Sequence, residues 1–267
     1  MNTPIIITAF GTTSTALNTY SYMDERLKKY LPDHEIIWSY SSRMVKDWIK
    51  KRHNIEMKHP HQVLNELKEK GHSWAVVQSL HLICGHEFYR LAREANISGI
   101  RTSMGLPLLT DPGDYAVVAH GIKTSYQTDK DEALVLVGHG TDHPGWASYT
   151  TLLHISREKF GEKIFIGAIE EGYLSQEKTI EDVKKAGFKK VRIIPFMIVA
   201  GVHFHEDLTG EDDSWKTGFE EEGFAVTVEP SGLGFNNGII EVYCKHIQDA
   251  LDIIPDSSPI RNADQIN

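Results

Sequence analysis

Four side chains able to bind a metal ion stand just beyond three apolar segments in the second half of this 267-residue chain. His139 follows the first segment, Glu170 and Glu171 follow the second, and His203 follows the third. Imidazole nitrogens and a carboxylate together form a ligand set that divalent transition metals accept. The glycines in Gly138-His139-Gly140 would let another bulky group approach the backbone closely. This part of the chain is therefore a candidate metal site.

Ordinary loop polarity explains the same residues equally well, and their spacing alone does not decide between the two explanations. The glycines could instead surround a phosphate group. Neither of the two glycine-rich nucleotide motifs, GxxxxGK[ST] and GxGxxG, occurs in the chain, so a nucleotide site is not expected.

Short β-branched segments alternate with amphipathic helical patterns from one end of the chain to the other. This alternation requires right-handed crossovers, so it predicts an α/β fold with parallel sheets and helices on both faces. Helix boundaries are marked by Pro60 and Gly71, by Asp111 and by Ser175. The predicted strands are residues 5–7, 36–38, 74–80, 100–106, 133–137, 164–169, 191–197 and 224–228.

The two halves of the chain resemble each other. Residues 9–12 align with residues 138–141, and residues 78–85 align with residues 194–201. A long repeat of this kind predicts two similar α/β lobes with a cleft between them. We expect an N-terminal lobe of residues 1–128 and a C-terminal lobe of residues 129–267 that carries the metal site. Ligands of open parallel sheets bind beyond the carboxyl ends of the strands, where the candidate residues lie.

Composition excludes several classes of protein. The formal net charge of −9 argues against a broad binding surface for nucleic acid or for an anionic membrane. No apolar run approaches the 20 or so residues that a membrane span requires. The two cysteines, Cys84 and Cys244, form neither a CxxC motif nor a disulfide framework, and no secretory leader is visible. A cytoplasmic protein is expected, and a homo-oligomer is one arrangement that the sequence leaves open.

Taken together, the motifs resemble one family over nearly the whole chain: the CbiK-type anaerobic cobalt chelatases, relatives of the class II chelatases that include ferrochelatase. The resemblance rests on VGHGT at 137–141 with His143-Pro144, GAIEEGY at 167–173, PFMIVAGVH at 195–203, DSWK at 213–216, SRM at 42–44, LHLI at 80–83 and GHE at 85–87.

The resemblance implies two Rossmann-like lobes, each a four-stranded parallel sheet flanked by helices, with the active site in the cleft between them. It also implies two histidines and one glutamate as metal ligands. The histidines are His139, which is also taken as the proton acceptor, and His203. Alignment on Gly172-Tyr173 selects Glu171 as the glutamate and is favoured, whereas alignment on Gly167 selects Glu170. His205 would share a face with His203 if that stretch is extended.

Further residues are candidates for the substrate. Glu87 stands at the equivalent strand end of the first lobe and could relay a second proton, although a carboxylate that only stabilises a helix start would look the same. Arg43 and Lys216 could bind substrate carboxylates, with surface ion pairs as the alternative. His86 and Thr141 are the remaining candidates for substrate contact, and an ordinary loop histidine is the favoured alternative for His86. The histidines at positions 53, 59 and 61 lie near a basic stretch, and no function is assigned to them.

The predicted activity is that of a lyase-type metal chelatase, a sirohydrochlorin cobaltochelatase. It would insert Co(II), its substrate metal, into sirohydrochlorin or precorrin-2 in anaerobic cobalamin biosynthesis. The resemblance implies no ATP, no other nucleotide and no organic cofactor, and the expected partner is the tetrapyrrole. One alternative is a ferrochelatase acting on sirohydrochlorin or a porphyrin. Another is a tetrapyrrole or metal carrier without turnover, which would need no proton acceptor at His139.

Overall fold

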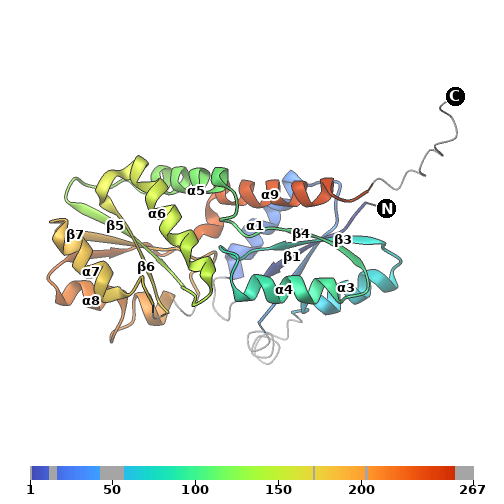
Figure 1. Ribbon diagram of the computed structural model, residues 1–267, viewed down its shortest axis with the longest axis horizontal. Helices are drawn as coiled ribbons and strands as arrows, with labels where there is room; N and C mark the ends of the chain where they lie inside the picture. Colours follow the sequence, from blue (N-terminus) through green and yellow to red (C-terminus); the bar gives the residue numbers. More distant parts are fainter. Residues whose placement is uncertain (1, 12–16, 43–56, 171, 202–203, 256–267) are drawn as a thin grey trace.

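The computed structural model describes residues 2–11, 17–42, 57–170, 172–201 and 204–255. The described chain folds into two lobes, each built on a four-stranded sheet with helices on both faces (Figure 1). The strand orders are β2-β1-β3-β4 and β6-β5-β7-β8, and every neighbouring pair is parallel. The predicted fold class is confirmed.

The observed elements follow the predicted alternation closely. The strands are β1 (Ile5–Ala9), β2 (Ile36–Tyr40), β3 (Trp74–Ser79), β4 (Arg101–Gly105), β5 (Glu132–Gly138), β6 (Ile164–Ala168), β7 (Lys190–Pro195) and β8 (Ala225–Val228). The α-helices are α1 (Leu17–Tyr30), α3 (Pro60–Glu69), α4 (His86–Asn96), α5 (Pro112–Ser125), α6 (Ala147–Phe160), α7 (Gln176–Lys185), α8 (Trp215–Glu221) and α9 (Asn237–Asp252).

Side chains of the central strands alternate between the two faces of each sheet. In β1, Ile5 and Ile7 pack with residues of α1 and α9, whereas Ile6 packs with residues of α3 and α4. In β5, Leu134 packs with α6, whereas Val135 packs with residues of α7 and α8. Both faces of each central strand are therefore buried, which explains why these segments read as continuous apolar runs.

The helix that closes each half of the chain crosses toward the other lobe. Helix α9 packs against β3 and β4 of the first sheet, and α5 lies beside α6 of the second lobe (Figure 1). One hydrophobic cluster consequently joins residues of both sheets. The boundary between residues 128 and 129 stays a prediction, but α9 packs on the first sheet although it follows the second sheet in the chain.

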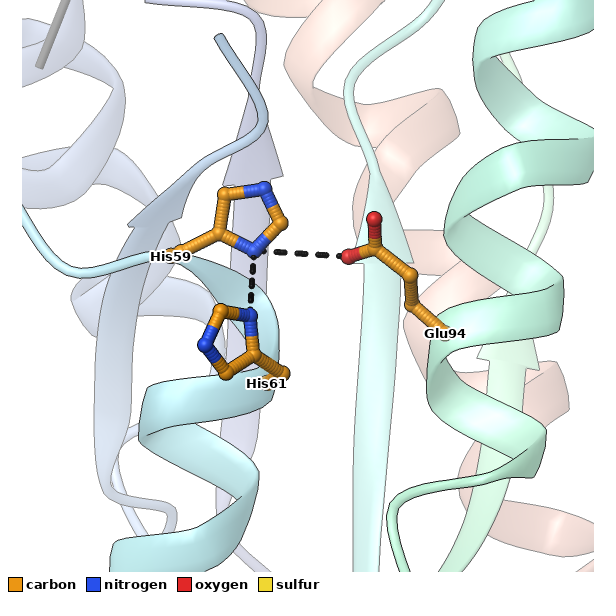
Figure 2. Close-up of side chains that lie close together, drawn as sticks. All are labelled: His59, His61 and Glu94. Carbon is orange, nitrogen blue, oxygen red and sulfur yellow. Dashed lines mark hydrogen bonds and ion pairs between the residues drawn. The ribbon is translucent and has the colours of Figure 1, made fainter. Parts of the chain in front are cut away.

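Helices α3 and α4 cover the same face of the first sheet. His59 is the N-cap residue of α3, and its backbone N–H donates to Gln62 Oε1 at 2.9 Å. The His59 side chain is buried and lies close to His61 and to Glu94 of α4 (Figure 2). Polar side chains therefore join the two helices at one end of an otherwise apolar contact.

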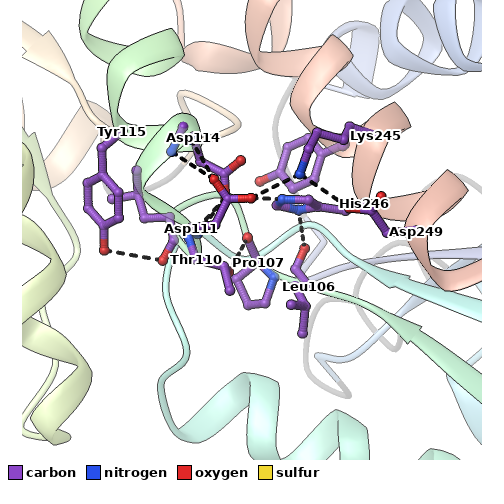
Figure 3. A network of polar contacts seen from close by, with 12 residues as sticks. Leu106, Pro107, Thr110, Asp111, Asp114, Tyr115, Lys245, His246 and Asp249 are labelled. Atoms are coloured by element: carbon purple, nitrogen blue, oxygen red, sulfur yellow. Dashed lines mark hydrogen bonds and ion pairs between the residues drawn. The ribbon is translucent and has the colours of Figure 1, made fainter.

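A polar network fastens α9 to the start of α5 (Figure 3). The Asp111 carboxylate caps α5, as predicted, and lies 2.9 Å from Lys245 Nζ. His246 is buried, and its Nε2 lies 3.1 Å from Asp114 Oδ2 while its Nδ1 lies 3.0 Å from the carbonyl oxygen of Leu106. This buried pair holds the crossing helix in place.

Two local features differ from the sequence expectations. Helix α8 has only seven residues with Gly218 at its centre, so it shows no clear periodicity and is not predicted. Residues Phe204–Leu208 form a π-helical turn, so the extended conformation that would align His205 with His203 is not found there. Among the described residues, no helix combines the length and the apolar character needed to cross a membrane.

Candidate active site

The end of β5 and the end of β6 bring one histidine and one carboxylate together. The backbone ladder continues past both strands, because Ile169 N–H donates to Gly138 O at 3.0 Å and Glu170 N–H donates to His139 O at 2.9 Å. The side chains then meet, with His139 Nδ1 3.3 Å from Glu170 Oε1. Both side chains are 48% exposed, so a ligand can reach them.

The two glycines that flank His139 are required by close packing. A Cβ at Gly138 would lie 2.7 Å from the ring of Tyr149. A Cβ at Gly140 would lie 3.0 Å from the Cβ of Ala168. Gly140 also has φ of +90°, a conformation that other residues adopt only with strain. The Gly138-His139-Gly140 motif therefore has a structural reason as well as a chemical one.

The ring of Tyr149 packs against Gly138 in this loop. The sequence did not single this residue out. Burial raises the pKa of its phenol to about 12. A hydrogen bond from the Gly140 backbone lowers the pKa, but burial has the larger effect. The charge of the neighbouring Glu170 carboxylate contributes to this raised pKa. The phenol therefore stays neutral near pH 7. Tyr149 lies on α6, outside the motifs found in the sequence, so its role could be recognised only from the folded structure.

The strand-end loops of the two lobes touch each other. His86 Nε2, at the start of α4, lies 2.8 Å from Asp142 Oδ1 in the loop after β5. The His86 and His143 rings are 5.0 Å apart, and the Tyr89 and His143 rings are 5.3 Å apart. Thr141 shapes the loop, because its Oγ1 accepts from His143 N–H at 3.1 Å. Residues 80–87 and 139–146 form what we call the interlobe loops.

Two predicted substrate or catalytic groups already have charged partners. Glu87 forms an ion pair with Arg90 one turn along α4. Lys216, in the first turn of α8, lies 3.7 Å from Glu220. Both are partly exposed and could exchange these partners for substrate, because surface ion pairs of this kind contribute only about 0–1 kcal/mol.

Three of the predicted site residues, Arg43, Glu171 and His203, lie outside the described residues. Their roles stay predictions. His205 is described, is exposed and packs its ring against Phe204 at 5.2 Å.

His81 lies in the interlobe loops, within the LHLI motif at 80–83, and the sequence alone assigns it no role. Its Nδ1 lies 2.7 Å from Ser79 Oγ, and its Nε2 is buried and has no hydrogen-bond partner among the described residues. Burial, and secondly the charge of Arg90, lower its pKa from 6.5 to about 4. The ring is therefore neutral near pH 7, in contrast to a histidine that exchanges protons there.

Comparison with known proteins identifies the family. The model of the cobalt chelatase (CbiK) family matches residues 3–252. The chain belongs to the CbiK cobalt chelatase family. It is therefore a metal chelatase, an enzyme of the lyase type, as the sequence motifs predict.

Members with curated names resemble this CbiK-family chain over almost its full length. A sirohydrochlorin cobaltochelatase of Salmonella typhimurium is 29% identical and aligns with 95% of this chain and 98% of its own. The sirohydrochlorin cobaltochelatase CbiKC of Nitratidesulfovibrio vulgaris is 27% identical, over 94% of this chain and 92% of its own.

Solved structures support the fold. SirB from Bacillus subtilis with Fe3+ superposes with a TM-score of 0.65 at 14% identity, covering 94% of this chain and 96% of its own. CbiX, described as the terminal enzyme of siroheme biosynthesis in denitrifying bacteria, gives a TM-score of 0.55 at 16% identity. It covers 92% of this chain and 99% of its own. At this identity the likeness concerns the two-lobed architecture alone.

Proposed function

We propose that this enzyme inserts Co(II) into sirohydrochlorin, or into its precursor state precorrin-2, in anaerobic cobalamin biosynthesis. The names of the two curated relatives support this substrate. The observation that carries the proposal is the contact between His139 and Glu170 where β5 and β6 end.

The spacing of that contact suits one metal ion. Two atoms bonded to the same ion at about 2.05 Å with tetrahedral geometry lie about 3.3–3.4 Å apart. The His139 Nδ1 to Glu170 Oε1 distance is 3.3 Å. His203 would supply the third ligand, and Glu171 is the alternative carboxylate. A nitrogen and oxygen ligand set without thiolate, on half-exposed side chains, can also release the ion to the macrocycle.

The chemistry requires two proton acceptors. The macrocycle loses two pyrrole protons as the hydrated Co(II) sheds water and enters the ring. In the proposal, His139 takes one of them, because an imidazole ordinarily titrates near neutral pH. Glu87 would take the second from the other lobe, after leaving its partner Arg90.

Substrate recognition would come from charges around this site. Sirohydrochlorin carries many carboxylates, so Lys216 and Arg43 are the proposed cations, with His86 and Thr141 as further contacts. We also propose that the enzyme works in the cytoplasm without nucleotide, organic cofactor, nucleic acid or membrane partner. The acidic net charge and the lack of a nucleotide motif support this.

A turnover assay tests the proposal. Catalytic amounts of protein are mixed with excess sirohydrochlorin and Co(II), and the absorbance change is followed with the non-enzymatic rate subtracted. Many product molecules per protein are expected. A reaction that stops at one equivalent would instead indicate a carrier, and a faster reaction with Fe(II) than with Co(II) would indicate a ferrochelatase.

A further inference from the structure

Three metal-binding side chains converge on the first lobe, away from the residues assigned to chelation. His59 Nδ1 lies 2.8 Å from His61 Nδ1 and 3.4 Å from Glu94 Oε2 (Figure 2). The three ligand atoms all lie within 4.8 Å of one another. The two histidines come from the start of α3, and the glutamate comes from α4.

These separations match those of ligands bound to one ion. Nitrogen and oxygen ligands at about 2.05 Å from a metal lie about 2.9 Å apart at a right angle, and about 3.3–3.4 Å apart in a tetrahedron. The observed 2.8 Å and 3.4 Å fall close to these two values. A small adjustment of the exposed His61 ring would accommodate an ion between the three atoms.

The surroundings of His59 orient it for this role. Its Nε2 lies 3.2 Å from the carbonyl oxygen of Ser41, which can only accept a hydrogen bond. In the neutral ring, the hydrogen is then on Nε2 and the lone pair is on Nδ1, directed at His61 and Glu94. Metal-bound histidines are commonly held in this way, with the second ring nitrogen donating to a carbonyl or a carboxylate.

Burial strengthens the attraction between the Glu94 carboxylate and a cation at this position. The His59 side chain is 4% exposed and that of Glu94 is 23% exposed, so water screens the carboxylate only in part. Without an ion, His61 Nδ1 donates a hydrogen bond to the His59 Nδ1 lone pair, so metal binding moves the His61 hydrogen to Nε2, and the Glu94 carboxylate favours a positive charge beside it. A divalent ion would supply it and would join α3 to α4 directly.

The cluster is distinct from the proposed chelation site. Glu87, in the first turn of α4, belongs to the interlobe loops, whereas Glu94 lies two turns further along the same helix. Seven residues correspond to about 10 Å along a helix axis. The His139 and Glu170 contact belongs to the other lobe.

We propose that His59, His61 and Glu94 form a second, resident binding site for a divalent transition-metal ion such as Zn(II). Imidazole and carboxylate ligands favour such an ion over Mg²⁺ or Ca²⁺, which prefer oxygen ligands alone. The bound ion stabilises the packing of α3 against α4 and is not delivered to the macrocycle.

Equilibrium dialysis against Zn(II) alone tests the site, in a variant that lacks the chelation ligands, His139→Ala with His203→Ala. This variant should keep one tightly bound equivalent. Adding His61→Ala or Glu94→Gln should weaken the remaining binding by at least about 100-fold, since even loss of an outer partner costs 10–100-fold. The matched control is His154→Ala, an exposed histidine of α6, which should change nothing.

Thermal unfolding gives a second readout that does not depend on chelatase activity. Zn(II) should raise the unfolding temperature of the protein with His139 and His203 replaced, and the additional His61→Ala substitution should abolish that rise. The proposal is overturned if the background variant binds no Zn(II), or if it binds Zn(II) equally well with and without His61 and Glu94. A failure of cobalt insertion in the turnover assay would leave these results unchanged.

Discussion

The two lobes share one strand order but carry different chemistry where their strands end. His139 follows β5, and the aligned residue after β1 is Phe10, whose side chain is 47% exposed. His203 aligns with Glu87, and Met197 aligns with His81. Each of these two imidazoles therefore aligns with a residue of different chemistry in the other lobe, His139 with Phe10 and His81 with Met197.

This difference separates what the fold provides from what the side chains provide. Both lobes bring strand-end loops to the same interlobe edge, as parallel sheets must. The second lobe places the exposed imidazole of His139 beside a carboxylate from its neighbouring strand end, Glu170. In the first lobe, Glu87 is paired with Arg90, and His81 is neutral near pH 7 because burial of its ring lowers its pKa to about 4. We infer that the second lobe handles the metal and the first lobe contacts the macrocycle.

The largest effect should separate the carboxylates of the two lobes. Glu170→Gln should lower the rate of cobalt insertion by about 100-fold, because a metal ligand is lost. Glu87→Gln should lower the rate at saturating Co(II) without weakening the affinity for Co(II), because it removes a proposed proton acceptor and no metal ligand. Initial rates at saturating and at limiting Co(II) measure both.

Glu171→Gln is the essential companion variant. Alignment on Gly172-Tyr173 favours Glu171, whereas the contact with His139 supports Glu170. If Glu171→Gln proves more damaging than Glu170→Gln, the alignment is right and the assignment from the contact is wrong.

A smaller effect, on how stability depends on pH, should distinguish His81 from Met197, its counterpart in the second lobe. Its pKa of about 4 in the folded protein lies below the 6.5 of the unfolded chain, so the unfolded state binds an extra proton between these values. Stability should therefore fall as pH drops from about 6.5 to about 4, by about 2–3 kcal/mol from this group. His81→Met, which installs the residue of the second lobe, should remove that part of the dependence.

Urea unfolding at pH 7 and at pH 4.5 measures the difference. The control is His154→Met, which replaces an exposed histidine. This variant should show the same loss of stability between pH 7 and pH 4.5 as the wild-type protein. If His81→Met and the wild type lose the same free energy of unfolding between pH 7 and pH 4.5, His81 does not stay neutral in the folded state.

The smallest effect concerns a glycine pair. Gly11 and Gly140 occupy equivalent positions and have φ of +106° and +90°. Gly11→Ala and Gly140→Ala should each cost about 1–2 kcal/mol of stability. Only Gly140→Ala should also reduce chelation at a temperature where both variants are folded, because it displaces His139 from Glu170. Equal loss of chelation in both would remove the distinction between the lobes.

Most of the fold could be predicted from local patterns. Asp111 and Ser175 cap helices α5 and α7 as expected, because an acidic or hydroxyl side chain before a periodic segment satisfies free backbone N–H groups. The crossing of α9 onto the first sheet could not be predicted. Periodicity shows that one face of a helix is buried, but it does not show which sheet buries it.

The candidate site was predictable only in part, for a similar reason. His139 and Glu170 follow neighbouring strands, so the rule for parallel sheets brings them together. His59 and His61 looked like members of a basic stretch, because Glu94 is more than 30 residues away in the chain. Tyr149 and His81 acquire their shifted pKa values from burial, which only the folded structure supplies.

One measurement tests the central claim, that the second lobe carries the metal chemistry. Initial rates of cobalt insertion into sirohydrochlorin are compared for His139→Ala and for Phe10→Ala, the substitution at the aligned position of the first lobe. Because a proton acceptor contributes about 10²- to 10⁴-fold, His139→Ala should lose at least 100-fold. Phe10→Ala should stay within about 10-fold of the wild type, with both variants unfolding at similar temperatures. Near-normal rates for His139→Ala, or a greater loss for Phe10→Ala, would contradict the account.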